Sequence, residues 1–161
     1  MSAQDYGRFL QGSPLGIGLD AQDCETLAAI MQLRRLEDGE VLIEEGGRDD
    51  SLYLLTSGRL AVTRDATGGD HVTLHVMKAG DLAGEMGFVT GDEHIASLNA
   101  LGPTEVLVLE RAKLEALIDT QPRLVYQLMR AIARSVHNTL SRLNQQFIEL
   151  QNYVTKTHGR Y

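Results

Sequence analysis

The chain has few of the features that would narrow its function at once. Its 161 residues include a single cysteine, Cys24, so no disulfide can form within the chain. A chain of this length buries about 70% of the surface that its unfolded form exposes, so it needs neither a disulfide nor a structural metal to fold. The lack of disulfides also fits a reducing compartment. These features predict one domain with an ordinary hydrophobic core.

Long apolar runs and an excess of positive charge are also missing. The opening MSAQDYGRFLQGSPLG is too polar for a signal peptide, and no run approaches the ~18 to 20 apolar residues that cross a bilayer. The chain has 15 Lys and Arg residues against 22 Asp and Glu residues, a net charge of −7. Proteins that bind nucleic acid directly need a basic surface. We therefore expect a cytoplasmic protein that contacts neither a membrane nor nucleic acid directly.

What the sequence does contain is a series of short β-favouring runs. Residues 1–18, rich in Gly, Ser and Gln, predict a flexible lead-in, and Asp20 with Asp23 forms a capping-box pattern before a helix predicted at 21–32. From 33 to 110, runs such as EVLIEE, SLYLLTS and HVTLHVM recur about every ten residues between Gly-, Asp- and Asn-rich breaks. Strands without long helices between them pair antiparallel. The pattern predicts a mainly β fold of seven or eight strands, as a sandwich, barrel or jelly roll with flanking helices.

The last part of the chain predicts a long helix. Pro122 suits the first turn and nothing breaks the helix before Val154, so we place it at 121–155, with a tail at 156–161. A helix of this length runs roughly 50 Å, which is more than the β domain can cover.

The far half of this helix therefore needs another partner, and an identical helix is the simplest one; the alternative is a helix folded back on its own domain. Apolar residues repeat along one side at seven-residue and three-four spacing, which favours a homodimer. The predicted contact residues are Val125, Met129, Ile132, Val136, Leu140, Leu143, Phe147 and Leu150.

Two segments, LEDGEVLIEEGGRDDSLYLLTSGRLAVTR and KAGDLAGEMGFVTGDEHIAS, carry a family resemblance. They resemble the cyclic nucleotide-binding domain of the catabolite-activator type and of protein-kinase regulatory subunits. The resemblance covers residues 19–143. It implies an antiparallel, jelly-roll-like β-roll with flanking helices at 19–120, a phosphate-binding cassette after Gly84, and a C-terminal dimerisation helix. Residues 155–161 leave no room for the DNA-binding domain of that family, so we expect a module without one or a fragment of a transcription regulator.

Within the cassette, the resemblance assigns ligand contacts to Gly84, Glu85 and Met86. Glycine at 84 lets the backbone approach a ligand, and the Glu85 carboxylate would accept a hydrogen bond from a ribose hydroxyl. The alternative for Glu85 is a surface carboxylate that complements a helix dipole.

The phosphate end of the cassette departs from the family. The family motif ends in arginine, a small or hydroxyl residue and alanine, whereas this chain has His94, Ile95 and Ala96. Arginine is always charged and can bond two phosphate oxygens, whereas histidine is mostly neutral at pH 7 and offers one donor at a time. Arg59 or Arg64 is an alternative phosphate partner. The other reading of His94 is an exposed loop residue.

Other candidate sites are weaker. The resemblance places Thr139 where a threonine would contact the base, although it also suits an irregularity in the helix seam. His71 and His75 alternate with apolar residues, so they should share the outer face of a strand, but two histidines do not make a metal site. Cys24 predicts a small core residue rather than a nucleophile.

We therefore expect a non-catalytic regulatory or sensor module of cyclic nucleotide-binding fold that passes a signal to an unidentified protein partner. Its phosphate-binding cassette is altered, with His94 in place of arginine. The residues alone establish no cofactor, and the resemblance implies cAMP or cGMP as the ligand. Two alternatives are a functional cAMP- or cGMP-binding protein with atypical phosphate contacts and a dimerisation or docking protein with a vestigial pocket.

Overall fold

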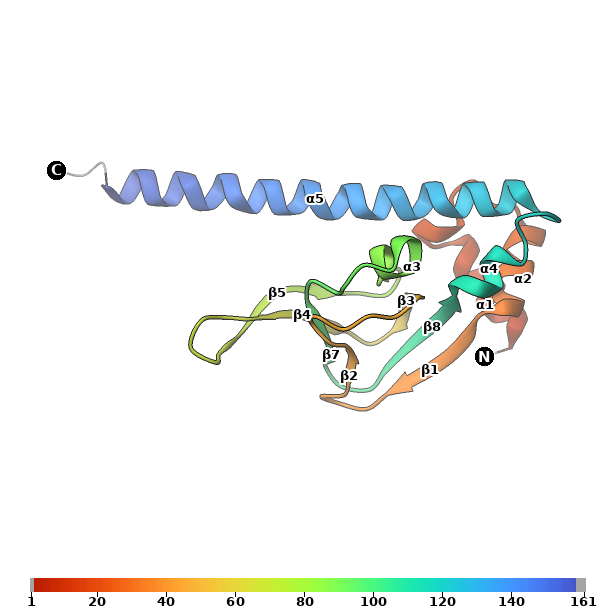
Figure 1. The fold of residues 1–161 in the computed structure, drawn as a ribbon, viewed down its shortest axis with the longest axis horizontal. Coiled ribbons are helices and arrows are strands. Elements are labelled where there is room, and N and C mark those ends of the chain that lie inside the picture. The colour runs from red at the N-terminus through yellow and green to blue at the C-terminus, as the bar shows by residue number, and fades with distance from the viewer. Residues whose placement is uncertain (1, 159–161) are drawn as a thin grey trace.

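The structure is a computed structural model that describes residues 2–158 (Figure 1). Helices gather at one end of a β-roll, and a long helix runs along one side of it. In chain order the elements are α1 (Ala3–Gln11), η1 (Pro14–Gly16), α2 (Ala21–Ile30), β1 (Gln32–Leu36), β2 (Val41–Ile43), β3 (Ser51–Ser57), β4 (Leu60–Asp65), β5 (His71–Met77), β6 (Leu82–Ala83), α3 (Glu85–Thr90), β7 (Ser97–Ala100), β8 (Thr104–Glu110), α4 (Arg111–Glu115) and α5 (Pro122–His158).

The predicted antiparallel fold with flanking helices is confirmed. The described residues form two four-stranded sheets, with the strand orders β1-β8-β3-β6 and β2-β7-β4-β5. Strand β3 shows how the layers pack. Leu52 and Leu54 join the core shared with the helices, whereas Tyr53 and Leu55 join the core inside the roll. Because successive side chains of a strand point to opposite faces, this one strand supports both cores.

The first predicted helix is also confirmed. Helix α2 begins after Asp20, whose carboxylate accepts a hydrogen bond from the Asp23 amide at 2.8 Å, and Asp23 accepts one in return from the Asp20 amide at 3.2 Å. This reciprocal capping box fixes the start of the helix. The Cys24 side chain is buried in the core, as predicted, and burial raises the pKa of its thiol.

The predicted flexible lead-in at 1–18 is wrong for the residues that the structure describes. Helix α1 packs on α2, and both Leu10 and Leu15 are fully buried. The glycines in this segment serve close packing. A Cβ on Gly16 would lie 2.1 Å from the Leu10 carbonyl oxygen, and one on Gly7 would touch the Glu25 side chain at 3.5 Å. Glycine therefore lets η1 fold tightly against α1.

Helix α5 begins at Pro122, as predicted, and extends to His158, beyond the predicted end at 155. Residues 159–161 of the predicted tail lie outside the described residues. The first half of α5 packs on its own domain, where Ile132 is 3% exposed, and Val125 and Met129 pack against the same core. The prediction that Ile132 contacts a second copy is therefore wrong.

The second half of α5 extends past the β4–β5 hairpin (Figure 1). The exposed fractions of the predicted contact residues in this half, Leu140, Leu143, Phe147 and Leu150, lie between 43% and 62%. The described residues include no helix that combines the length and apolar character of a membrane span.

The packing of α1 predicts that the N-terminal segment contributes to stability. We expect Leu10→Ala to lower the free energy of unfolding by about 2–5 kcal/mol, because it leaves a cavity in the shared core. The neighbouring exposed change Gln11→Ala should cost less than about 0.5 kcal/mol. Urea denaturation of both variants checks this. Equal small losses would mean that α1 is not part of the folded core.

Candidate functional site

The candidate cassette begins where the chain leaves β6 and turns into α3. Gly84 has φ 77°, a left-handed conformation, and a Cβ there would lie 2.7 Å from the Ser51 carbonyl oxygen and 3.1 Å from Cδ2 of Tyr53. A side chain at this position would be strained and would collide with β3, so only glycine suits it. The tight turn places Glu85 at the start of α3, as the sequence motif predicts.

Glu85 connects the cassette to the long helix. Its Oε1 accepts a hydrogen bond of 2.9 Å from Oγ of Ser135 on α5. Burial raises the pKa of Glu85, while hydrogen bonds from its own backbone amide and from Ser135 act in the opposite direction. Figure 1 shows α3 between α5 and the strands. Sequence reasoning missed Ser135, although it lies one helical turn before Thr139 and so on the same side of α5.

His94 is not the exposed loop residue of the alternative reading. Its side chain is 8% exposed, and Nε2 lies 3.3 Å from Oδ2 of Asp49 without making a well-aligned hydrogen bond. The backbone amide of His94 donates to the Gly47 carbonyl at 2.9 Å, and its carbonyl accepts from the Gly46 amide at 2.8 Å. These bonds hold the end of the cassette motif against the turn after β2.

Asp49 places a carboxylate beside this histidine. Tyr53 donates its hydroxyl to Oδ2 of Asp49 at 2.8 Å, and the Ser51 amide donates to Oδ1 at 3.2 Å. Burial and the hydrogen bond to this carboxylate raise the pKa of Tyr53 to about 12, so the phenol keeps its proton. Nothing in the sequence pointed to Asp49, because the contact joins residues 45 positions apart.

The imidazole also packs closely against α3. A Cβ on Gly87 would lie 3.0 Å from Cε1 of His94 and 2.9 Å from the Asp49 carbonyl oxygen. Glycine at 87 is therefore needed for His94 and Asp49 to reach the helix. The space next to the middle of α3 is filled by the imidazole ring and the Asp49 backbone.

Three arginines around the cassette contact carboxylates, whereas the buried Nε of Arg142 on α5, seven residues after Ser135, has no hydrogen-bond partner among the described residues. Arg48 contacts Glu93 at 2.9 Å, and Arg111 lies 3.9 Å from Asp50. Arg64, one of the two alternative phosphate partners, contacts Glu45 at 3.3 Å.

The other alternative, Arg59, follows β3 at its far end. Gly84 contacts Ser51 at the start of that strand, and the strand runs to Ser57, so its two ends lie roughly 20 Å apart. In this structure neither Arg59 nor Arg64 takes the place of the cassette arginine.

The remaining predicted site residues differ in exposure. Ile95 is 77% exposed and Met86 is 46% exposed, whereas Ala96 and Thr139 are partly buried. The structure brings Gly84, Glu85 and His94 together around α3. It places Thr139 on the same side of α5 as Ser135, with Ile95 at the surface.

The two strand histidines have different surroundings. Nδ1 of His71 lies 2.7 Å from Asp65, whereas burial and the nearby charge of Arg142 lower the pKa of His75. A β-bulge lies between them, because His75 pairs with Val62 and Thr73 with Thr63. It breaks the strict alternation on which their shared face was predicted. Residues 2–158 contain no group of three or more potential metal ligands.

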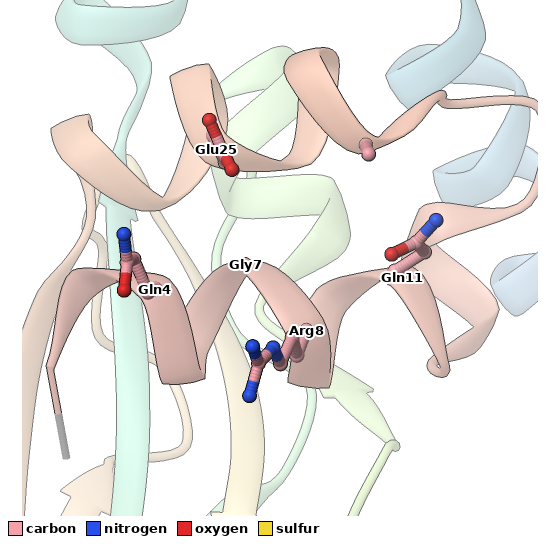
Figure 2. A pocket seen from close by; sticks show the side chains of 6 residues that line it. Gln4, Gly7, Arg8, Gln11 and Glu25 are labelled. Atoms are coloured by element: carbon pink, nitrogen blue, oxygen red, sulfur yellow. The ribbon is translucent and has the colours of Figure 1, made fainter.

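A separate cavity of about 150 Å³ lies between α1 and α2 (Figure 2). In Figure 2 the Arg8 side chain points away from Glu25, so the polar groups do not converge on one point. The cavity contains none of the predicted site residues. Its lining residues are Gln4, Gly7, Arg8, Gln11, Ala21 and Glu25.

Comparison with known proteins agrees with this architecture. The family model of the cyclic nucleotide-binding domain matches residues 33–121, more than half of the chain. The cyclic AMP receptor protein of Thermus thermophilus is 33% identical over 125 residues, which is 78% of this chain and 58% of the relative. The chain thus spans little more than half the length of that relative.

Solved structures show the same fold. A cyclic nucleotide-binding domain from Methylobacillus flagellatus superposes with a TM-score of 0.84 at 22% identity, over 91% of this chain and 85% of the other. The regulatory subunit of a cAMP-independent protein kinase A from Trypanosoma cruzi, bound to guanosine, gives a TM-score of 0.66 at 22% identity, over 87% and 50%. The family match over residues 33–121 shows that this chain belongs to the cyclic nucleotide-binding domain family.

Proposed function

We propose that the chain is a cytoplasmic, non-catalytic regulatory module that binds a ligand at the cassette and signals to a protein partner through α5. The observation that carries this proposal is the hydrogen bond between Glu85 and Ser135, because it joins the cassette directly to the long helix. A ribose hydroxyl that takes the same position on Oε1 of Glu85 replaces the Ser135 hydroxyl. Ligand binding is thereby coupled to the contacts of α5.

The outer half of α5 is the proposed output surface. Leu140, Leu143, Phe147 and Leu150 follow three-four spacing and are exposed in the single chain. Such a stripe is typical of a coiled-coil seam, which favours a parallel homodimer. The stripe that remains free begins at Leu140, after the part of α5 that packs on its own domain.

The contacts at the phosphate end of the cassette predict that ordinary cyclic nucleotides bind with low affinity. The Asp49 carboxylate lies beside His94, where the family has an arginine, and a phosphate brought there would face a like charge. The fold also accommodates a ligand without a phosphate, since the Trypanosoma cruzi neighbour is bound to guanosine. There are three alternatives. They are a functional cAMP- or cGMP-binding protein with atypical phosphate contacts, a dimerisation or docking protein with a vestigial pocket, and a fragment of a transcription regulator.

The proposed dimer predicts a change of mass. We expect the wild-type chain to sediment as a dimer at tens of micromolar, and Leu143→Glu with Leu150→Glu to give a monomer, because buried glutamates would destabilise the apolar seam. Ile148→Glu is the matched control, since Ile148 is 52% exposed but lies off the seam. A monomeric wild type would contradict the dimer.

Repair of the phosphate end tests the altered cassette. We expect His94→Arg, Ile95→Ser and Asp49→Asn together to strengthen cyclic AMP binding by about 30- to 1,000-fold, or roughly 2–4 kcal/mol. The variant without Asp49→Asn should gain less, because Asp49 would pair with the new guanidinium. Isothermal titration measures both. A folded triple variant without any gain would favour the vestigial pocket.

The buried carboxylate predicts a pH dependence of stability. Because the pKa of Glu85 is raised in the folded state, the folded protein holds its proton more tightly. The wild type therefore loses stability, relative to Glu85→Gln, as the pH rises through the interval between 4.5, the ordinary pKa of a glutamate, and the raised pKa of Glu85 in the folded protein. At neutral pH we expect Glu85→Gln to be at least as stable as the wild type.

Glu45 provides the matched control, since hydrogen bonds, chiefly from the Asp65 amide, lower its pKa. A lowered folded-state pKa stabilises the protein above the ordinary value, so Glu45→Gln should lose stability at neutral pH and recover it in acid. Thermal denaturation across the pH range compares the two variants. Loss of stability at neutral pH in Glu85→Gln would show that its carboxylate is a structural group.

A further inference from the structure

We propose that the cassette binds an uncharged ribonucleoside in preference to the corresponding cyclic nucleotide. This inference rests on the proposed function, in which the cassette binds a ligand, and it names the class of that ligand. Three features of the site support the inference. They are the charge at the phosphate end, the packing at that end, and the hydroxyl group of Ser135 that donates a hydrogen bond to Glu85.

The charge at the phosphate end opposes an anion. The Asp49 carboxylate accepts hydrogen bonds from the Tyr53 hydroxyl and the Ser51 amide, which hold it in place. It lies 3.3 Å from Nε2 of His94, so this histidine already faces a negative charge. The nearby cations Arg48 and Arg64 contact Glu93 and Glu45. A ligand without a phosphate avoids the repulsion from Asp49 at this end of the cassette.

The packing points the same way. The His94 imidazole is 8% exposed and lies so close to α3 that a methyl group on Gly87 would meet Cε1 at 3.0 Å. The Asp49 carbonyl oxygen lies within 2.9 Å of the same position. The space between His94 and the middle of α3 is therefore already filled, so a phosphate group enters there only by displacing the ring.

The ribose end has the opposite character. Glu85 is an acceptor whose Oε1 now bonds to a hydroxyl, that of Ser135, at 2.9 Å. A ribose hydroxyl is the same kind of donor, so it can replace Ser135 without leaving the buried carboxylate unpaired. Thr139, one helical turn further along α5, presents a second hydroxyl on the side of Ser135, where a base can bond to it. The site can therefore recognise hydroxyls and a base without an anion.

Calorimetric titration of the full chain tests the inference. The probes are adenosine, guanosine, their 2′-deoxy forms, cyclic AMP and cyclic GMP, all at neutral pH. We expect the better ribonucleoside to bind at least about tenfold more tightly than its cyclic phosphate and than its 2′-deoxy form, because one charged or hydroxyl contact is worth about that much.

Two variants locate the cause. Asp49→Asn should narrow the preference for the nucleoside by strengthening cyclic nucleotide binding, whereas Asp50→Asn, the neighbouring carboxylate paired with Arg111, should leave the preference unchanged. Ser135→Ala should tighten nucleoside binding, because the competing hydroxyl is gone. Circular dichroism verifies that each variant is folded, and the wild-type comparison decides the inference if a variant is not.

The outcomes separate this inference from the proposed function. If the wild type binds a cyclic nucleotide more tightly than the matching nucleoside, the ligand class is wrong and the sensing role stands. If the folded wild type binds none of the probes, both the ligand class and the ligand-sensing role are overturned. If the 2′-deoxy form binds as tightly as the ribonucleoside, the ribose contact with Glu85 is overturned.

Discussion

A carboxylate that folding removes from water needs hydrogen-bond donors. For the buried Glu85 carboxylate, one donor is the hydroxyl of Ser135 on the long helix. An unpaired buried carboxylate would be strongly destabilising. Gly84 places Glu85 at the first position of α3, because its left-handed conformation turns the chain tightly against β3 directly before the helix. The Ser135 hydrogen bond thus adds to the apolar contacts that hold the first half of α5, and a hydroxyl from a ligand can also make this bond.

The other end of the cassette follows a different electrostatic rule. Two unit charges about 4 Å apart interact by about 4 kcal/mol at an effective dielectric constant of about 20. A phosphate next to Asp49 would experience a repulsion of that order, while the family's arginine would have supplied an attraction. The hydrogen bond from Tyr53 keeps Asp49 at this place. The two ends of the cassette therefore differ: the Glu85 end favours hydroxyl groups of a ligand, and the Asp49 end disfavours an anion.

The sequence predicted the parts of the site that are local in the chain. Gly84, Glu85 and His94 lie within one short motif, and the motif places them around α3 as observed. Asp49 lies in the loop before β3 and Ser135 lies on α5, both far from the motif in the chain, so no local sequence pattern predicts them. The histidine's burial could not be foreseen either, because it depends on Gly87 admitting the ring.

The glycines of residues 1–18 were the reason for predicting a flexible lead-in, and that prediction was wrong. Gly16 allows close packing against Leu10 in an ordered segment. The apolar repeat of α5 likewise did not show where the core ends, since Ile132 belongs to the domain and Leu140 to the exposed stripe.

Hydrogen exchange along α5, measured with and without a saturating ribonucleoside, tests most directly whether the cassette controls this helix. We expect protection to change in peptides that contain Ser135 and in the outer half beyond Leu140, because the ligand replaces one of the contacts that hold the helix. Saturation of the cassette with unchanged protection throughout α5 would contradict it.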